Sequence, residues 1–521
     1  MTGALSLGPL ATSVPLLLVA LLGFTNREVR PRYIPRLAEG SALLAFFLAL
    51  ASLAALVLRG SETLSLVDFH GLAVSFRADV LSVAMLLLVT FIGWIVVRYA
   101  CTYLDGEARQ GPFLGWLCLT LASVLLLVAS GNLIQLLVAW VATSLCLHKL
   151  LLFYPDRAAA RRAARKKFVT ARLGDLALII AVAFLALAYE STDIATIMAD
   201  ARSGAGGGLA VVAAAFLGLA ACLKSAQFPT HGWLTEVMET PTPVSALLHA
   251  GVINAGGFLL VRFADVMLLA PGVLAVLVIV GGFTALFGSL VMLTQPAVKT
   301  SLAWSTVAQM GFMIFECGLG LFPLALLHIV AHSLYKAHSF LASGGAVERV
   351  AAIRRPGPVA IPGVRAVVRA FAVSLLIYVA VGAVFGLQHK SPQEILIGAI
   401  LIFGVAYMLA QGLADAAPVA LMRRTVVYAV ATSVGYFALQ MAMIYLTAGT
   451  LPPAPMPGPL QWLLIPLAVL SFGFVAIIQA MFPLWAHHPA AAGLRVHLSN
   501  GLYANALFDR IIGGWSKKSV H

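Results

Sequence analysis

Charged residues are scarce in this sequence. They make up 10% of 521 residues, while 61% are hydrophobic; a soluble domain carries about 25% charged residues. The 5 cysteines form no CxxC pair, which argues against a disulfide framework, a zinc site or an iron–sulfur site. The sequence also lacks a Walker loop and a dinucleotide fingerprint, so energy from ATP or NADH would have to arrive through another subunit.

Long apolar runs take the place of charge. They recur along the whole chain, each with the roughly 18 residues or more that are needed to cross the hydrocarbon core. Because lipid offers no partner for unpaired backbone groups, we expect an all-α, polytopic membrane protein with about 14–15 transmembrane helices. The expected spans are 7–24, 39–58, 79–100, 113–130, 132–154, 167–190, 208–227, 242–264, 269–294, 300–318, 321–345, 364–386, 393–415, 421–447 and 459–482. Residues 1–482 then form a single transmembrane domain with its core at 75–415, and 483–521 form an amphipathic cytoplasmic C-terminal tail.

The net charge of +13 indicates topology and not nucleic-acid binding. Basic clusters follow odd-numbered spans, at 27–36, 156–167 ("DRAAARRAARKK"), 349–355 and 423–424. The positive-inside rule therefore predicts a periplasmic N-terminus and a cytoplasmic tail in a bacterial inner membrane. After the second span, residues 61–78 alternate apolar and polar side chains, which predicts a short hairpin outside the membrane.

Lys224 is the most unusual residue within an apolar run. It stands in "CLKSAQFPTHGWL" (222–234), at the end of a run that holds no other charge. A charge at the bilayer centre costs roughly 2.5–3.5 kcal/mol, and Pro229 removes a backbone donor nearby. Unwound backbone at that depth is tolerated only where it lines a cavity. The pattern indicates a broken helix with a titratable lysine; the alternative is a lysine that merely neutralises a neighbouring carboxylate.

Histidine and lysine gather again in "LLHIVAHSLYKAHSFLASGG" (326–345). His328, His332 and Lys336 are spaced i, i+4, i+8, which places them on one helix face. We expect a proton relay, with structural polar packing as the alternative; no carboxylate or cysteine lies close enough in sequence to favour a metal. His249, alone in an apolar run, is either a proton relay or a hydrogen-bonded core residue.

Four other polar residues lie in or beside the spans. Glu236 and Lys299 lie near helix ends and are further candidates for proton translocation. The alternatives are that Glu236 is a surface carboxylate and that Lys299 snorkels to the membrane surface. Asp175, one turn into the sixth span, can pair with Arg172 or with a lysine across the bundle. Glu316 is intramembrane as well, and the sequence indicates no partner for it.

These motifs resemble those of a known family. "KSAQFPTHGWLTEVMETPTPVSALLHAGVINAGG", "VKTSLAWSTVAQMGFM" and "LHIVAHSLYKAHSFLASGG" resemble, in the same order, blocks of the proton-translocating antiporter-like subunits of respiratory complex I and Mrp antiporters. The resemblance covers about residues 75–345 and implies an antiporter-like fold with inverted repeats and broken helices. It also implies that the proton-translocation residues are Lys224, His249, Lys299, His328, His332 and Lys336, with Asp175 in an R-x-G-D element.

The sequence departs from the family pattern at two positions. The family's fifth span usually carries a glutamate that pairs with the broken-helix lysine, and Val141 stands at that place here. His148, Lys149 and Asp175 are the residues that would compensate. A second family lysine, beside an "EIL" stretch, corresponds only to Lys390, displaced by about two positions in "QHKSPQEILIGA".

Within the family, the altered fifth span, the short tail and its "HLSNGLYANALFDRI" stretch look most like the DabB-type subunits of bacterial inorganic-carbon transporters. That resemblance implies a cytoplasmic DabA-like partner, related to carbonic anhydrases, which holds the zinc. It implies no cofactor in this chain, no nucleic-acid partner, and flow of protons or sodium that drives CO2 and bicarbonate uptake. The alternatives are an Mrp-type sodium/proton antiporter, a respiratory NADH dehydrogenase subunit, and a membrane anchor that conducts nothing.

Overall fold

The computed structural model describes residues 8–26, 28–69, 72–345, 363–413, 418–485 and 488–513. Within them, 13 helices are long and apolar enough to cross a membrane. Two further helices of 21 residues, α15 (Val298–Gly318) and α16 (Phe322–Ala342), pack in the same bundle and carry most of the polar residues discussed below. Each expected span overlaps one of these helical segments, although the one at 242–264 is interrupted within its length, and the all-α, polytopic prediction is confirmed. The predicted basic cluster at 349–355 lies outside the described residues.

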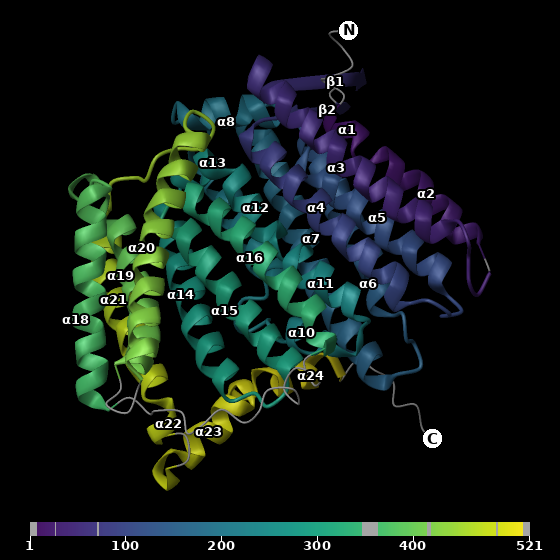
Figure 1. The fold of residues 1–521 in the computed structure, drawn as a ribbon. Coiled ribbons are helices and arrows are strands. Elements are labelled where there is room, and N and C mark those ends of the chain that lie inside the picture. Colours follow the sequence, from purple (N-terminus) through teal and green to yellow (C-terminus); the bar gives the residue numbers. More distant parts are fainter. Residues whose placement is uncertain are drawn as a thin grey trace.

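The helices form a large bundle, a smaller group beside it and a segment beneath both (Figure 1). The large bundle comprises α1 (Gly8–Ala11), α2 (Val14–Thr25), α3 (Ile34–Arg59), α4 (Val80–Tyr103), α5 (Gln110–Val128), α6 (Leu133–Leu151), α7 (Ala158–Tyr189), α8 (Ile194–Arg202), α9 (Gly207–Lys224), α10 (Gly232–Thr235), α11 (Thr242–Ala250), α12 (Ala255–Arg262), α13 (Ala264–Leu268), α14 (Pro271–Leu293), α15 and α16. The smaller group comprises α18 (Val364–Val384), α19 (Pro392–Gly412), α20 (Val419–Thr447) and α21 (Pro459–Ala480), and it packs on the bundle through α14 and α16.

The expected hairpin is present. Strands β1 (Glu62–Phe69) and β2 (Leu72–Ala78) pair antiparallel, with a bulge between Ser65 and Val67. A buried acid ties this hairpin to the bundle: Asp79 caps α4 and accepts hydrogen bonds from Arg77 Nε and Arg262 Nη1, both at 2.6 Å. Burial raises the pKa of the Asp79 carboxyl, but the two guanidinium groups outweigh burial and hold that pKa well below its usual range.

The helix break expected after Lys224 is also present. α9 ends at Lys224, and residues 225–231 are not helical before α10 begins. Polar contacts replace the lost helical bonds: Ser225 Oγ donates to Ile253 O at 3.0 Å, and Phe228 N donates to Thr284 Oγ1 at 3.1 Å. A second interruption, which the sequence did not indicate, follows His249, where Gly251 separates α11 from a short 3-10 turn and α12.

Helices α14 and α15 touch backbone to backbone. A Cβ added at Gly281 would lie 2.5 Å from Phe315 N, and one added at Gly311 would lie 2.5 Å from Ala285 N. Real Cβ atoms do not approach this closely, so only glycine permits this helix spacing. The close contact fixes α15, which carries several polar residues of the site, against its neighbour.

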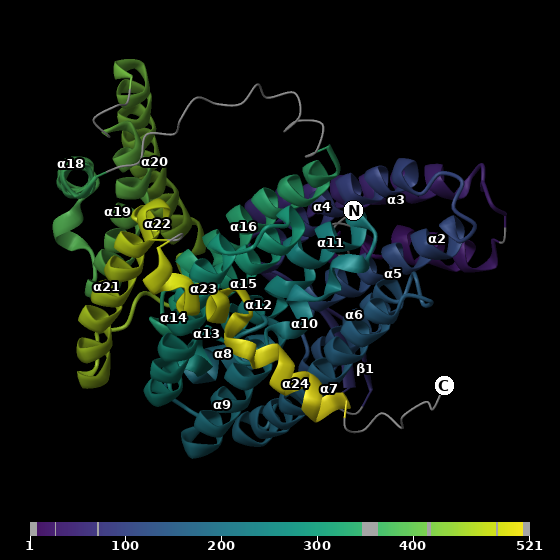
Figure 2. The ribbon, with the colours of Figure 1, turned by 90° about the horizontal axis from the view of Figure 1, so that it is seen from below.

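The C-terminal segment lies beneath the bundle. α22 (Phe482–Trp485), α23 (Ala492–Ser499) and α24 (Ala504–Gly513) run across the underside towards α7 and α10 (Figure 2). Lys166 Nζ contacts Asp509 of α24 at 2.8 Å and Glu236 at 2.6 Å, and Lys166 is only 1% exposed. The tail therefore shares a face with the basic 156–167 segment, which the positive-inside pattern also assigns to the cytoplasm.

Candidate functional site: a row of buried basic residues

The first basic group of the site is Lys224, at the C-terminal end of α9. Helix α7 packs on this end of α9, where Gly174 lies beside Leu223 and Ala220. The Lys224 side chain is 9% exposed, and its Nζ lies 4.3 Å from the centroid of the Trp140 ring. No hydrogen-bond acceptor contacts this Nζ among the described residues. The aromatic face is thus the direct contact of the ammonium.

The acid that acts electrostatically on Lys224 is Asp175, on α7. Its Oδ2 lies 2.6 Å from Arg172 Nη2. The charged residues near enough to act on Lys224 electrostatically include Asp175, Arg172 and Lys167. Val141 follows Trp140 on α6 and is part of the apolar packing there. The structure therefore places an acid from a different helix near the lysine whose family partner Val141 replaces.

Lys167 is a second buried lysine here, and sequence reasoning missed it. It is 5% exposed, and its Nζ donates to Ser144 O at 2.6 Å and to Ser144 Oγ at 3.0 Å. Lys167 and Lys224 both line a small cavity of about 20 Å³, which is enough for about one water molecule. The basic run at 156–167 hid Lys167, but its i+3 and i+7 spacing to the buried residues Thr170 and Gly174 was a visible signal.

His249 links the α11 break to α15. Its Nδ1 lies 3.1 Å from Thr306 Oγ1, and its ring stacks on Phe340 with centroids 4.2 Å apart. His249 is fully buried, and its Nε2 has no partner among the described residues. One ring nitrogen is therefore held and the other is left for a mobile donor or acceptor.

The α16 residues predicted to share a face lie along the bundle interior. Lys336 is 0% exposed, and its Nζ donates to Ser305 Oγ at 2.8 Å and to Leu302 O at 3.1 Å, both on α15. His332, one turn away, is 5% exposed, and neither of its ring nitrogens has a partner among the described residues. The rings of His328 and His332 are 6.0 Å apart at their centroids.

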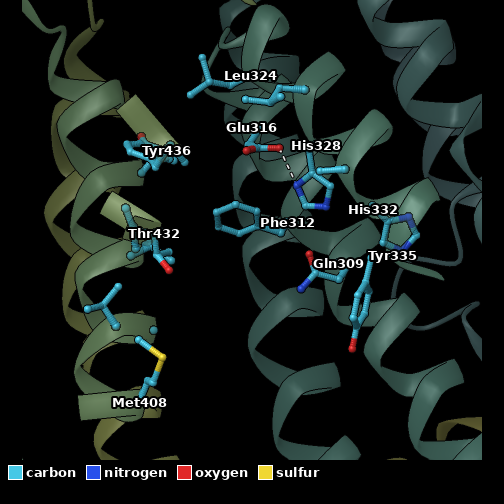
Figure 3. Close-up of a pocket in the computed structure, with 17 residues that line it drawn as sticks. Gln309, Phe312, Glu316, Leu324, His328, His332, Tyr335, Met408, Thr432 and Tyr436 are labelled. Carbon is cyan, nitrogen blue, oxygen red and sulfur yellow. Dashed lines mark ion pairs between the residues drawn. The ribbon is translucent and has the colours of Figure 1, made fainter. Parts of the chain in front are cut away.

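Glu316, for which the sequence gave no partner, contacts the last histidine of this row. Its Oε2 lies 3.0 Å from His328 Nδ1, as Figure 3 shows. This pair and His332 line a cavity of about 610 Å³ between α15 and α16 on one side and α19 and α20 on the other.

Three predicted site residues lie apart from this row. Lys299 Nζ donates to Thr242 Oγ1 at 3.3 Å near the start of α15. Glu236 contacts Lys166 Nζ, which also contacts Asp509 of the C-terminal segment. Lys390 lies in the turn before α19, with Nζ 3.6 Å from Glu394, and α19 then runs unbroken to Gly412. Roles of these residues in proton translocation stay predictions. Among the described residues, no group of at least three His, Cys, Asp or Glu side chains is placed to hold a metal ion.

Comparisons with known proteins agree with this architecture. The family model described as "NADH:quinone oxidoreductase/Mrp antiporter, TM" matches residues 130–387, and that of the complex I chain 5 N-terminus matches 66–114. Among solved structures, the Mrp complex from Dietzia sp. aligns with a TM-score of 0.64 at 22% identity, covering 98% of this chain and 59% of the matched chain. An archaeal membrane-bound sulfane sulfur reductase aligns with a TM-score of 0.58 at 16% identity, covering 98% of both chains. At these identities the two structures demonstrate a shared fold.

The chain therefore belongs to the family of antiporter-like membrane subunits found in NADH:quinone oxidoreductases and Mrp antiporters, and it is a multi-pass membrane protein. Within that family it is similar to the DabB subunits. It is 39% identical to the probable inorganic carbon transporter subunit DabB2 of Halothiobacillus neapolitanus, over 84% of this chain and 80% of the relative. It is 46% identical to the probable subunit DabB of Hydrogenovibrio crunogenus, over 51% of this chain and about half (52%) of that relative.

Proposed function

We propose that this chain conducts protons, or another cation, across the membrane. The observation that carries the proposal is the row of basic side chains inside the bundle, in which Lys224, His249, Lys336 and His332 are buried and His328 is partly buried. Polar atoms along the row lack partners among the described residues: Lys224 Nζ, His249 Nε2 and both nitrogens of His332. An unpaired buried polar group costs about 1–3 kcal/mol, so water molecules are the partners that this row requires. Imidazoles, amines and water together make a path along which protons can move.

We infer that ion flow through this chain drives a soluble partner. The relatives named as inorganic carbon transporter subunits support a DabA-like, carbonic-anhydrase-related partner and energy-driven uptake of CO2 and bicarbonate. One proton that crosses 100 mV releases about 2.3 kcal/mol. The chemistry of CO2 hydration and its zinc then belong to the partner, and this chain is a transporter subunit without a cofactor. The partner docks on the predicted cytoplasmic face, where the tail and the 156–167 segment lie together.

The decisive experiment uses the chain together with its partner in sealed vesicles. A proton gradient is imposed, and accumulation of labelled bicarbonate is measured with and without an uncoupler. Lys224→Ala is expected to abolish uncoupler-sensitive accumulation while the complex still assembles. Arg36→Ala is the control, because Arg36 is an exposed cation in the first turn of α3, which carries no residue of the row.

Three outcomes would contradict the proposal. Accumulation by Lys224→Ala at the unaltered rate removes Lys224 from the path. If the unaltered complex accumulates bicarbonate at the same rate with and without the uncoupler, the result favours a membrane anchor that conducts nothing. Sodium efflux driven by protons, with no effect on bicarbonate, favours an Mrp-type antiporter.

A further inference from the structure

Glu316 is a buried acid that joins the basic row at its α16 end. It lies two residues before the end of α15 and is 4% exposed. Its carboxylate contacts His328 Nδ1 at 3.0 Å. The two atoms are within hydrogen-bond distance but are not aligned as a hydrogen bond, so proton exchange between them requires a rotation of one of the two groups. None of the other basic groups in the row has a carboxylate in direct contact among the described residues.

The pair borders a cavity that is large enough for a chain of water molecules. The cavity measures about 610 Å³, whereas a water molecule occupies about 30 Å³ in the liquid. Its lining is mainly apolar, but it includes the polar residues His328, His332, Thr432 and Tyr436, and His328 Nε2 and Tyr436 Oη have no hydrogen-bond partner among the described residues (Figure 3). These groups supply the polar contacts that water in such a cavity needs.

Of the two helices that form the opposite wall, α19 carries no acidic or basic residue beyond Glu394, whereas α20 carries Arg423 and Arg424 near its start and contributes Thr432 and Tyr436 to the lining. Residues 395–412, which form all of α19 beyond Glu394, contain no Asp, Glu, His, Lys or Arg. Helix α21 contains none either. Among the described residues that line the cavity, Glu316 is the acid in contact with His328.

We propose that Glu316 and His328 form the terminal proton-exchange site of this chain, which rests on the proposed conduction. Protonated His328 gives its Nδ1 proton to Glu316 Oε2, which leaves a neutral imidazole and a carboxylic acid. The acid then releases the proton to water in the cavity and returns to a carboxylate. The reverse sequence serves flow in the other direction.

A second cavity supplies a continuation from this site. It measures about 410 Å³ and shares Gln309, Phe312, His328, Ile400 and Gly404 with the first. It extends to Ser289 and Gln479, near the C-terminal ends of α14 and α21. Those ends lie towards the tail, since Gln295, just beyond α14, donates to Ser499 O at 3.2 Å.

The test measures proton flux into vesicles that contain the full chain, with a pH-sensitive dye and a potassium diffusion potential. Glu316→Gln keeps the shape and removes the exchangeable charge, and we expect flux to fall at least tenfold. Glu316→Asp is expected to restore part of that loss. Glu39→Gln is the matched control, since Glu39 is a partly exposed acid on α3 that lies beside Arg98 of α4. If Glu316→Gln conducts at the rate of the unaltered chain, the assignment is overturned. If the unaltered chain itself shows no proton flux, the proposed conduction is overturned.

Two further measurements keep the assignment testable if Glu316→Gln does not fold. Dicyclohexylcarbodiimide, an apolar reagent for protonated carboxyls, is expected to modify Glu316 in the unaltered chain and to block flux in proportion. Gly404→Phe is expected to obstruct the junction of the two cavities and to lower flux severalfold. A Cβ at Gly404 or at the control Gly40 meets no atom within 4 Å, so Gly40→Phe tests the same change away from the cavities. Full flux after modification of Glu316, no modification at all, or equal flux in the two phenylalanine variants contradicts the proposal.

Discussion

The ammonium of Lys224 lies over the face of Trp140, with Nζ 4.3 Å from the ring centroid. A desolvated cation on an aromatic face gains about 2 kcal/mol. The residue that follows, Val141, stands where the resembled family carries a glutamate. Here the aromatic ring supplies the direct contact, and Asp175 supplies the negative charge from α7.

Trp140→Leu should lower both thermal stability and cation flux, because it removes the π face and opens space beside Lys224. A loss of about 2 kcal/mol corresponds to a melting temperature lower by several degrees. The stability and flux of Trp140→Phe should lie between those of the unaltered protein and those of Trp140→Leu, since phenylalanine retains a smaller ring. Differential scanning fluorimetry and vesicle flux provide the measurements. Trp462→Leu, on the exposed side of α21, is the control, and equal effects at both positions would deny the cation–π contact any special role.

Asp175→Asn should reduce cation flux at least tenfold, because it removes the acid that balances Lys224 and leaves Arg172 without its 2.6 Å partner. Asp175→Glu should retain most of the flux. Adding Val141→Glu to Asp175→Asn should recover part of it, because it restores an acid at the position the family uses.

The control for this series is Asp105→Asn, an exposed acid whose side chain is 62% accessible. Proton flux measured in vesicles decides the outcome. If Asp175→Asn conducts like Asp105→Asn, the lysine does not depend on this acid.

Asp509→Ala should release the tail from the underside of the bundle, because it removes one of the two acids that contact the buried Lys166 Nζ. We expect limited proteolysis to cut the 488–513 segment several times faster, while the transmembrane helices stay intact. Arg510→Ala changes the exposed neighbouring residue and should leave the cleavage rate unchanged. Identical cleavage of the two variants would show that the ion pair does not hold the tail.

Acid should weaken the contact between the hairpin and the bundle only at low pH. Because Arg262 and Arg77 hold the pKa of Asp79 below its unfolded value of about 3.9, the stabilisation is fully present above that value and is lost as pH falls below it. The melting temperature of the unaltered protein should therefore exceed that of Asp79→Asn by a constant margin from about pH 7 to pH 5. The margin should narrow below about pH 4. A margin that stays constant down to about pH 3 would contradict this account.

Much of the fold was accessible from sequence because lipid restricts the choice of structure. Each long apolar run became a helix, and Lys224 beside Pro229 marked the break. The partners of the site residues were not accessible in this way. Asp175 and Lys224 belong to α7 and α9, which are not consecutive in the chain, and Glu316 and His328 belong to consecutive helices whose facing sides the sequence does not reveal. Sequence spacing shows which residues share one helix face, and it does not show which faces meet.

The backbone contact between α14 and α15 has a mechanical consequence. With the backbones in contact at Gly281 and Gly311, a shift of one helix along the other would bring larger neighbouring residues against the facing backbone, so we expect the two helices to move together. Helix α15 then holds Ser305, Thr306 and Glu316 at fixed positions relative to α14. For the proposed conduction, we therefore expect the change that prevents leakage to involve rotating side chains, shifting water or the helices on the other side of the cavity.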